Sequence, residues 1–212
     1  MVCHQYSLAE WITDGVIHAL GVILVLVAAA VLLHLAIADG DARLIIGSAV
    51  YASGLVACFG FSAAYNLTQA PRWRALLRRF DHAAIYLMIA GTYTPLSLIC
   101  IGGTIGTVLL ALVWSVALVG VGLKLIWPHR FEKLSLVLYL SLGWIGLIVI
   151  GRIIDVLPVP ALILLLVGGL FYTFGVVFHL WSRLPFQNAI WHGFVLTAAC
   201  FHYAAVLDSI FP

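Results

Sequence analysis

Long apolar runs, separated by short polar or Gly/Pro-containing interruptions, fill almost the whole chain. Each run approaches the roughly 20 residues that an α-helix needs to cross the hydrocarbon core of a bilayer. We therefore predict seven transmembrane helices, near residues 14–36, 43–66, 82–101, 105–127, 132–153, 160–181 and 188–210. Pro95 lies inside the third of these and should bend it. No stretch alternates like the strands of a membrane barrel, so the expected fold class is an all-α transmembrane bundle.

The composition places this chain in a membrane rather than in water. Hydrophobic residues make up 65% and charged residues 8% of its 212 residues, whereas a soluble domain carries about 25% charged residues. The first apolar run, residues 16–35, is too long for the core of a signal peptide and lacks a basic leader, so we expect it to remain as a helix. The loops are too short for a soluble module. Residues 1–212 should form a single seven-helix membrane domain.

The basic residues in the loops predict the orientation. Eight of the ten Lys and Arg residues fall on one side of the predicted topology: Arg72, Arg74, Arg78, Arg79, Lys124, Arg130, Lys133 and Arg183. The opposite side has only Arg43 and Arg152. Because positively charged loops stay in the cytoplasm, the N-terminus is predicted inside and, with seven spans, the C-terminus outside. In a bacterium this location is the cytoplasmic (inner) membrane, crossed many times.

The same charges indicate which classes of partner the chain could bind. The formal net charge is +2, and the basic residues are dispersed rather than gathered into a patch that could follow a phosphate backbone. Nucleic acid is therefore excluded as a partner, and membrane lipids are the expected one. The four cysteines show no CxxC spacing, so neither a disulfide framework nor a thiolate zinc site is indicated.

Polar side chains inside apolar helices are costly, so they mark candidate functional residues. Four sets stand out: Glu10, Asp14 and His18; Ser62 and Asn66; Asp81 beside His82; Asn188 and His192. A spacing of four stacks the members of a set on one helix face. The last three sets lie at the same cytoplasmic depth although more than a hundred residues separate them. They predict one polar pocket at the cytoplasmic ends of helices two, three and seven.

Several of these residues also have ordinary explanations. Glu10 could be solvated, and Asp14 could be a helix N-cap or a first-turn residue that meets the helix dipole. His179 lies near the same depth and could join the pocket, but an interfacial histidine beside Trp181 and Arg183 is the simpler interpretation.

Longer motifs then resemble a known family. The segments Tyr6–Glu10, Phe80–Pro95, Lys124–Ser135 and Ala189–Leu196 are similar to those of the bacterial hemolysin III family. That family belongs to the progestin and adipoQ receptor superfamily and is more distantly similar to the alkaline ceramidases. The resemblance covers nearly the whole chain and implies seven helices with the N-terminus inside, as the loop charges do.

The resemblance also implies a zinc ion near the cytoplasmic face. Its family ligands are a His in Ser-x-x-x-His on helix two and two His in His-x-x-x-His on helix seven, beside an Asp on helix three. These positions are Ser62 and Asn66, then Asn188 and His192, then Asp81. Asn replaces two of the three ligands, and an amide oxygen binds zinc more weakly than imidazole. His192 and Asp81 remain as metal candidates, with His179 as a substitute ligand, and the zinc site is predicted to be degenerate.

Three functions are compatible with these features. The first is a non-enzymatic role in membrane lipid, fluidity or energetics homeostasis, through a pocket of Asn66, Asn188, Glu10, Asp14 and His18. The second is a zinc-dependent, ceramidase-like lipid amide hydrolase, in which Asp81 and Ser62 would be catalytic; the two Asn replacements weaken it. The third is a cytolytic pore, which would need a continuous polar lining that the apolar outer halves of the helices do not supply. We expect the first.

Overall fold

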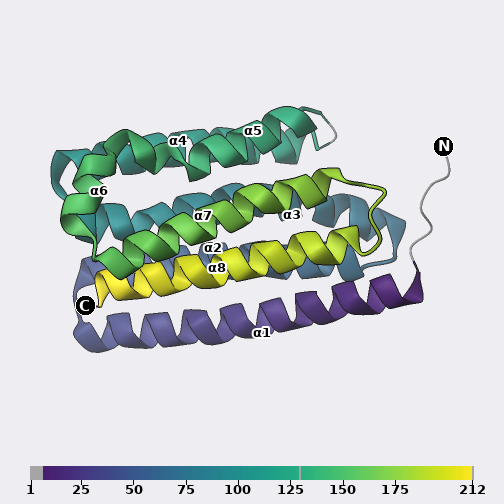
Figure 1. Cartoon of the computed structure of the whole chain (residues 1–212), viewed down its shortest axis with the longest axis horizontal. Helices are drawn as coiled ribbons and strands as arrows, with labels where there is room; N and C mark the ends of the chain where they lie inside the picture. Colours follow the sequence, from purple (N-terminus) through teal and green to yellow (C-terminus); the bar gives the residue numbers. More distant parts are fainter. Residues whose placement is uncertain (1–6, 129, 212) are drawn as a thin grey trace.

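The computed structural model describes residues 7–128 and 130–211, and it arranges them as a bundle of roughly parallel and antiparallel helices (Figure 1). The elements in chain order are α1 Leu8–Asp39, α2 Ala42–Leu67, α3 Pro71–Pro95, η1 Leu96–Ile101, α4 Gly103–Ile126, α5 Glu132–Gly143, η2 Ile145–Val149, α6 Ile150–Val156, α7 Val159–Leu180 and α8 Gln187–Ile210. No strand occurs among the residues described. Tyr6 and His129, which belong to the family motifs, lie outside the described residues.

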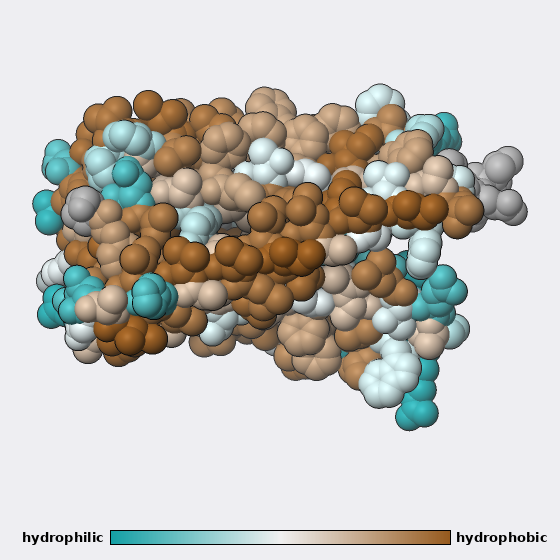
Figure 2. All heavy atoms as spheres, turned by 90° about the horizontal axis from the view of Figure 1, so that it is seen from below, coloured by the Kyte–Doolittle hydropathy of each residue, from teal (hydrophilic) through white to brown (hydrophobic). Residues whose placement is uncertain are grey.

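Seven helical segments within the described chain are long and apolar enough to cross a membrane. Two of them are composite, since α3 continues into η1 and α5 continues through η2 into α6. Figure 2 shows hydrophilic residues gathered at the two ends of the molecule, with a largely hydrophobic flank between them. The predicted all-α class and the predicted number of seven spans are confirmed.

The third span begins much earlier than the apolar pattern predicts. Helix α3 starts at Pro71 rather than near residue 82. Proline suits the first helical position because its fixed φ is already helical and its missing N–H would have had no partner there. The arginines from Arg72 to Arg79 therefore lie on the first turns of α3 and not in a loop, and Asp81 lies deeper in the helix than its opening turn.

Pro95 changes the helix type at the far end of the same span. The chain passes there from α3 into the π-helical segment η1. Pro95 has no N–H to donate to the preceding turn. The hydroxyls of Thr92 and Thr94 each donate, over 2.8 Å, to a carbonyl four residues earlier in the same helix. The wider η1 turn ends where Gly102 N–H donates to the Ser97 carbonyl over 3.0 Å, with Gly102 at φ +59°.

Close packing between α2 and α3 depends on glycines, which have no side chain. A Cβ on Gly54 would come within 2.9 Å of the Leu87 carbonyl oxygen, and one on Gly91 within 3.3 Å of the Val50 carbonyl oxygen. Small residues let helix backbones approach in this way where lipid provides no hydrophobic force between helices.

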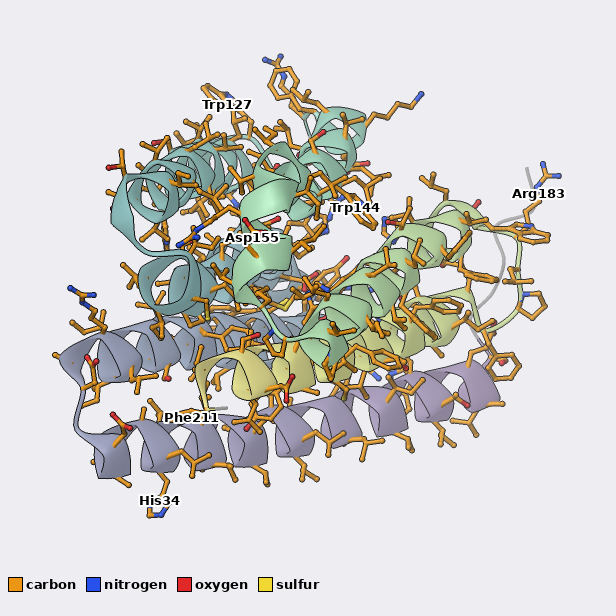
Figure 3. All side chains as sticks on the ribbon, turned by 60° about the vertical axis from the view of Figure 1, so that its left-hand side comes forward. His34, Trp127, Trp144, Asp155, Arg183 and Phe211 are labelled. Atoms are coloured by element: carbon orange, nitrogen blue, oxygen red, sulfur yellow. The ribbon has the colours of Figure 1, made fainter. Side chains whose placement is uncertain are left out.

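The two ends of the bundle are distinguished by the helix ends that meet at each. The start of α1, the end of α2, and the starts of α3 and α8 meet at the N-terminal end, and the C-terminus lies at the other end (Figure 1). The arginines of α3 and Arg183, which lies in the connection between α7 and α8 (Figure 3), are at the N-terminal end. The positive-inside prediction therefore assigns that end to the cytoplasm.

Candidate functional site

Polar side chains from four helices meet inside the N-terminal end of the bundle. We call them the polar cluster: Asp14 and His18 of α1, Ser62 and Asn66 of α2, Asp81 of α3, and Asn188 and His192 of α8. The three sets for which a common depth was predicted thus lie together, and α1 adds two further members. From the sequence, Asp14 and His18 were predicted to line the pocket but not to bind a metal.

Asp14 is the centre of the hydrogen bonds in the polar cluster. Only 4% of its surface is exposed. Its Oδ2 accepts from Asn188 Nδ2 over 2.9 Å, and its Oδ1 lies 3.2 Å from His192 Nδ1. Its backbone carbonyl lies 2.7 Å from His18 Nδ1. Because α1 begins at Leu8 with Ser7 as its N-cap, Asp14 is neither an N-cap nor a first-turn residue. Its side chain joins α1 to α8.

The two histidines of the polar cluster face each other. Their ring centroids are 4.2 Å apart, and the rings are inclined by 63°. Nε2 of His18 and Nε2 of His192 each lie 3.4 Å from the same atom, Ser62 Oγ. The side chain of His18 is 4% exposed and that of His192 14%. Among the residues described, Asp14, His18 and His192 offer ligand atoms that all lie within 4.8 Å of one another.

Glu10 has a structural role next to the polar cluster. It forms a capping box with Ser7, in which the Glu10 carboxylate accepts from Ser7 N–H over 2.8 Å and Ser7 Oγ accepts from Glu10 N–H over 3.2 Å. Its other carboxylate oxygen accepts from Phe186 N–H over 2.8 Å. Glu10 is 2% exposed, so the interpretation as a solvated residue is wrong. It fastens the connection before α8 onto the start of α1.

The two asparagines at the family's histidine positions bond to each other. Asn188 Nδ2 donates to Asn66 Oδ1 over 3.1 Å, and Asn66 Nδ2 donates to the Ser62 carbonyl over 2.9 Å. Because Asn66 Oδ1 already accepts a hydrogen bond from Asn188, and neutral amide oxygens are weak ligands for zinc, the family ligand set does not fit this chain. The amides here act as hydrogen-bonding links between α2 and α8.

The other titratable candidates lie around the polar cluster. The Asp81 carboxylate, 13% exposed, has Ser62 and His192 as polar neighbours, and its Oδ2 lies 4.0 Å from His82 Nε2. His179 is exposed, and its ring lies 4.9 Å from that of Trp191. His179 is thus outside the group of ligand atoms found among the described residues. His34 points away from the bundle (Figure 3).

A large cavity leads from the polar cluster into the bundle. Its volume is about 1330 Å³, and every residue of the polar cluster lines it. Further in, its walls become apolar, with Leu165 of α7, Leu140 of α5 and Leu157 after α6. Trp144 Nε1 donates to Thr173 Oγ1 over 3.0 Å and so joins the α5 and α7 walls. A polar end and a long apolar interior suit an amphipathic molecule.

Comparisons with known proteins agree with the fold and the motifs. A family model described as "Haemolysin-III related" matches residues 7–203. The chain is 36% identical to "Hemolysin-3" of Bacillus cereus over 203 residues, which is 96% of this chain and 93% of that protein. It is 34% identical to "Hemolysin-3 homolog" of Bacillus subtilis (strain 168), over 96% of this chain and 95% of that protein.

The chain is also similar, at lower identity, to a human protein. The chain is 30% identical over 166 residues to "Monocyte to macrophage differentiation factor" of Homo sapiens, covering 74% of this chain and 67% of that protein. No solved structure gives a significant match.

Proposed function

Because the chain belongs to the haemolysin-III related family of multi-pass membrane proteins, we propose that it binds a membrane lipid through the polar cluster and acts in homeostasis of membrane lipid, fluidity or energetics. The polar cluster would lie at the cytoplasmic face of a bacterial inner membrane. In this proposal the protein senses or adjusts the lipid state and need not turn a substrate over.

The observation that carries this proposal is the shape and lining of the cavity. At about 1330 Å³ it exceeds the roughly 300–1,000 Å³ of an ordinary small-molecule pocket. An acyl chain could lie along Leu140, Leu165 and Leu157 while a polar headgroup bonds the polar cluster at the N-terminal end.

Two adjacent residues of α7 allow a matched test of lipid binding. Val176 is half-buried and lines the cavity, whereas Val177 is 55% exposed on the outer face of the helix. We expect Val176→Trp to project an indole ring into the cavity and to reduce labelling by a photoactivatable fatty-acyl probe. Val177→Trp, which adds the same ring outside, should label like the wild type. Equal labelling of all three proteins would contradict lipid binding in the cavity.

The cellular role is tested with the same pair of variants. Cells that lack the gene are shifted to a temperature or lipid supply that changes membrane fluidity, and membrane order and proton-motive force are measured. The wild type and Val177→Trp should restore both quantities, and Val176→Trp should not. If deletion leaves both quantities unchanged under lipid stress, the homeostatic role is wrong, even if the purified protein binds lipid.

A further inference from the structure

We propose that the lipid bound in the cavity has an anionic phosphate headgroup, and that Lys124 of α4 and Ser135 of α5 hold its phosphate. This inference rests on the proposed lipid function and names the class of lipid. The phosphate site lies on the wall made by α4 and α5, whereas the polar cluster comes from α1, α2, α3 and α8. The neutral part of the headgroup remains free to bond the polar cluster.

The burial of Lys124 is the observation that carries this inference. Lys124 lies in the last turn of α4, lines the cavity and is only 2% exposed. A lysine near the end of a span ordinarily extends its ammonium group to the interface, and Lys124 does not. Its ammonium group forms no hydrogen bond or ion pair within the part of the chain that the structure describes. Because buried charges are ordinarily paired, Lys124 calls for an anion in the cavity.

The neighbouring charges do not supply this anion. The carboxylate that acts on Lys124 is that of Glu132, at the start of α5. Glu132 is already paired with Arg78 of α3 over 2.5 Å, and its side chain is 57% exposed. Two cations therefore share one exposed carboxylate. The dipole of α4 favours a cation in the last turn, but a dipole alone leaves the three ammonium protons without an acceptor.

Ser135 provides a second buried polar group on the same wall. It lines the cavity, is 3% exposed and follows Glu132 by three residues, so these two side chains are neighbours on one face of α5. Its hydroxyl lies beside that of Tyr86, which is buried without a hydrogen-bond partner among the described residues. The Tyr86 ring packs against α4 one turn before Lys124, where a Cβ on Gly120 would come within 2.4 Å of it. An ammonium group and hydroxyls suit phosphate oxygens, which accept hydrogen bonds.

Further cations lie at the N-terminal end of the cavity. Arg74 of α3 and Lys133 of α5 line it and are exposed. Exposed cations attract anionic lipids, and basic pockets between transmembrane helices on the cytoplasmic side bind anionic headgroups. A phosphate at this end would leave the acyl chains along the apolar walls further in, as the proposed function requires.

The first measurement uses the wild type alone. The purified full chain is delipidated in a neutral detergent and mixed with equal amounts of phosphatidylglycerol and phosphatidylcholine that have the same acyl chains. Phosphatidylglycerol has a net negative charge and phosphatidylcholine has none. Native mass spectrometry should show one phosphatidylglycerol retained per chain, preferred by at least about tenfold, because a hydrogen bond from a buried charged donor is strong.

Variants then locate the charge that makes this selection. Phosphatidylglycerol should raise the melting temperature of the delipidated wild type more than phosphatidylcholine does, and inorganic phosphate should leave it unchanged. Lys124→Met keeps the chain length and removes the charge, so the two lipids should stabilise it equally. Without lipid, Lys124→Met should melt higher than the wild type, because a buried charge without a partner has been removed. Arg72→Met is the matched control, since Arg72 is exposed at the same end and does not line the cavity, and it should respond like the wild type.

Four results would overturn this inference. The first is a wild type that binds the two lipids equally, which would show that no anion is needed. The second is a Lys124→Met protein that still prefers phosphatidylglycerol. The third is inorganic phosphate that alone reproduces the effect of phosphatidylglycerol, which would make the ligand a free anion and not a lipid. The fourth is a delipidated Lys124→Met that melts lower than the wild type, which would show that the ammonium group has its partner within the protein.

The failure of this inference can be told apart from the failure of the proposed function. If Val176→Trp loses acyl labelling while the wild type binds the two lipids equally, the cavity binds lipid without selecting an anion, and only this inference is wrong. If the acyl probe labels the wild type, Val176→Trp and Val177→Trp equally, the proposed function is wrong, and the inference that rests on it is wrong as well.

Discussion

The Asp14 carboxylate lies 3.2 Å from Nδ1 of His192, although the two residues are 178 positions apart in the chain. The contact joins the first and last spans of the bundle at the depth of the polar cluster. Asp14 has a second link to α8, through Asn188. One buried carboxylate therefore holds two side chains of α8 in place.

Replacing Asp14 by Ala should destabilise the protein by about 3 kcal/mol, because His192 and Asn188 would lose their buried acceptor. Thermal unfolding in detergent can be followed with a thiol-reactive dye, since Cys58 is a free thiol in the core. Thr13→Ala is the matched control, because the half-buried Thr13 hydroxyl donates within its own helix, to the Ala9 carbonyl. If Asp14→Ala and Thr13→Ala have the same melting temperature, the prediction is wrong.

Glu10→Ala should be more damaging than Ser7→Ala. Loss of the Ser7 cap costs about 1 kcal/mol, whereas loss of Glu10 also removes the acceptor of Phe186 N–H. Phe186 is held at φ +58°, a conformation that few residues other than glycine adopt. We expect Glu10→Ala to melt lower than Ser7→Ala and to be cleaved faster by protease in the connection of residues 181–186. Equal melting and equal cleavage would show that the contact with Phe186 contributes nothing.

The packing of α2 against α3 can be tested with two glycines of one helix. Gly54→Ala would bring a methyl group within 2.9 Å of the Leu87 carbonyl oxygen, whereas nothing lies within 4 Å of a Cβ on Gly60. Gly54→Ala should therefore lower the melting temperature, because a backbone atom cannot move aside as a side chain does. Gly60→Ala should leave it unchanged or raise it, since alanine favours a helix by up to about 1 kcal/mol over glycine. The opposite order would show that the two helices do not depend on close approach at Gly54.

Much of this architecture follows from the sequence alone. Each apolar run is long enough to cross a bilayer, and a crossing segment must satisfy its own backbone hydrogen bonds, so the number and type of the spans follow from length and hydropathy. The start of α3 could not be found in this way. Residues 71–80 carry four arginines that interrupt the apolar pattern, and they are helical because Pro71 begins a helix that extends beyond the apolar run.

The polar cluster was only partly predictable, for a different reason. The depth of Ser62, Asp81 and His192 follows from topology, because each lies near the same end of its span. Topology gives depth but not the rotation of a helix about its axis. The position of His18, facing His192, depends on that rotation and on the carboxylate of Asp14 between α1 and α8.

Orientation is the prediction on which the site's location in the cell depends. Alkaline phosphatase fused after the C-terminus should be active, because it folds only outside the cytoplasm, and green fluorescent protein at the same point should be dark. Green fluorescent protein inserted between Leu67 and Pro71, at the N-terminal end of the bundle, should fluoresce. The physical reason is the eight-to-two distribution of Lys and Arg between the two ends. The reverse pattern of reporters would place the polar cluster at the outer face, where a lipid headgroup would have to come from the outer leaflet.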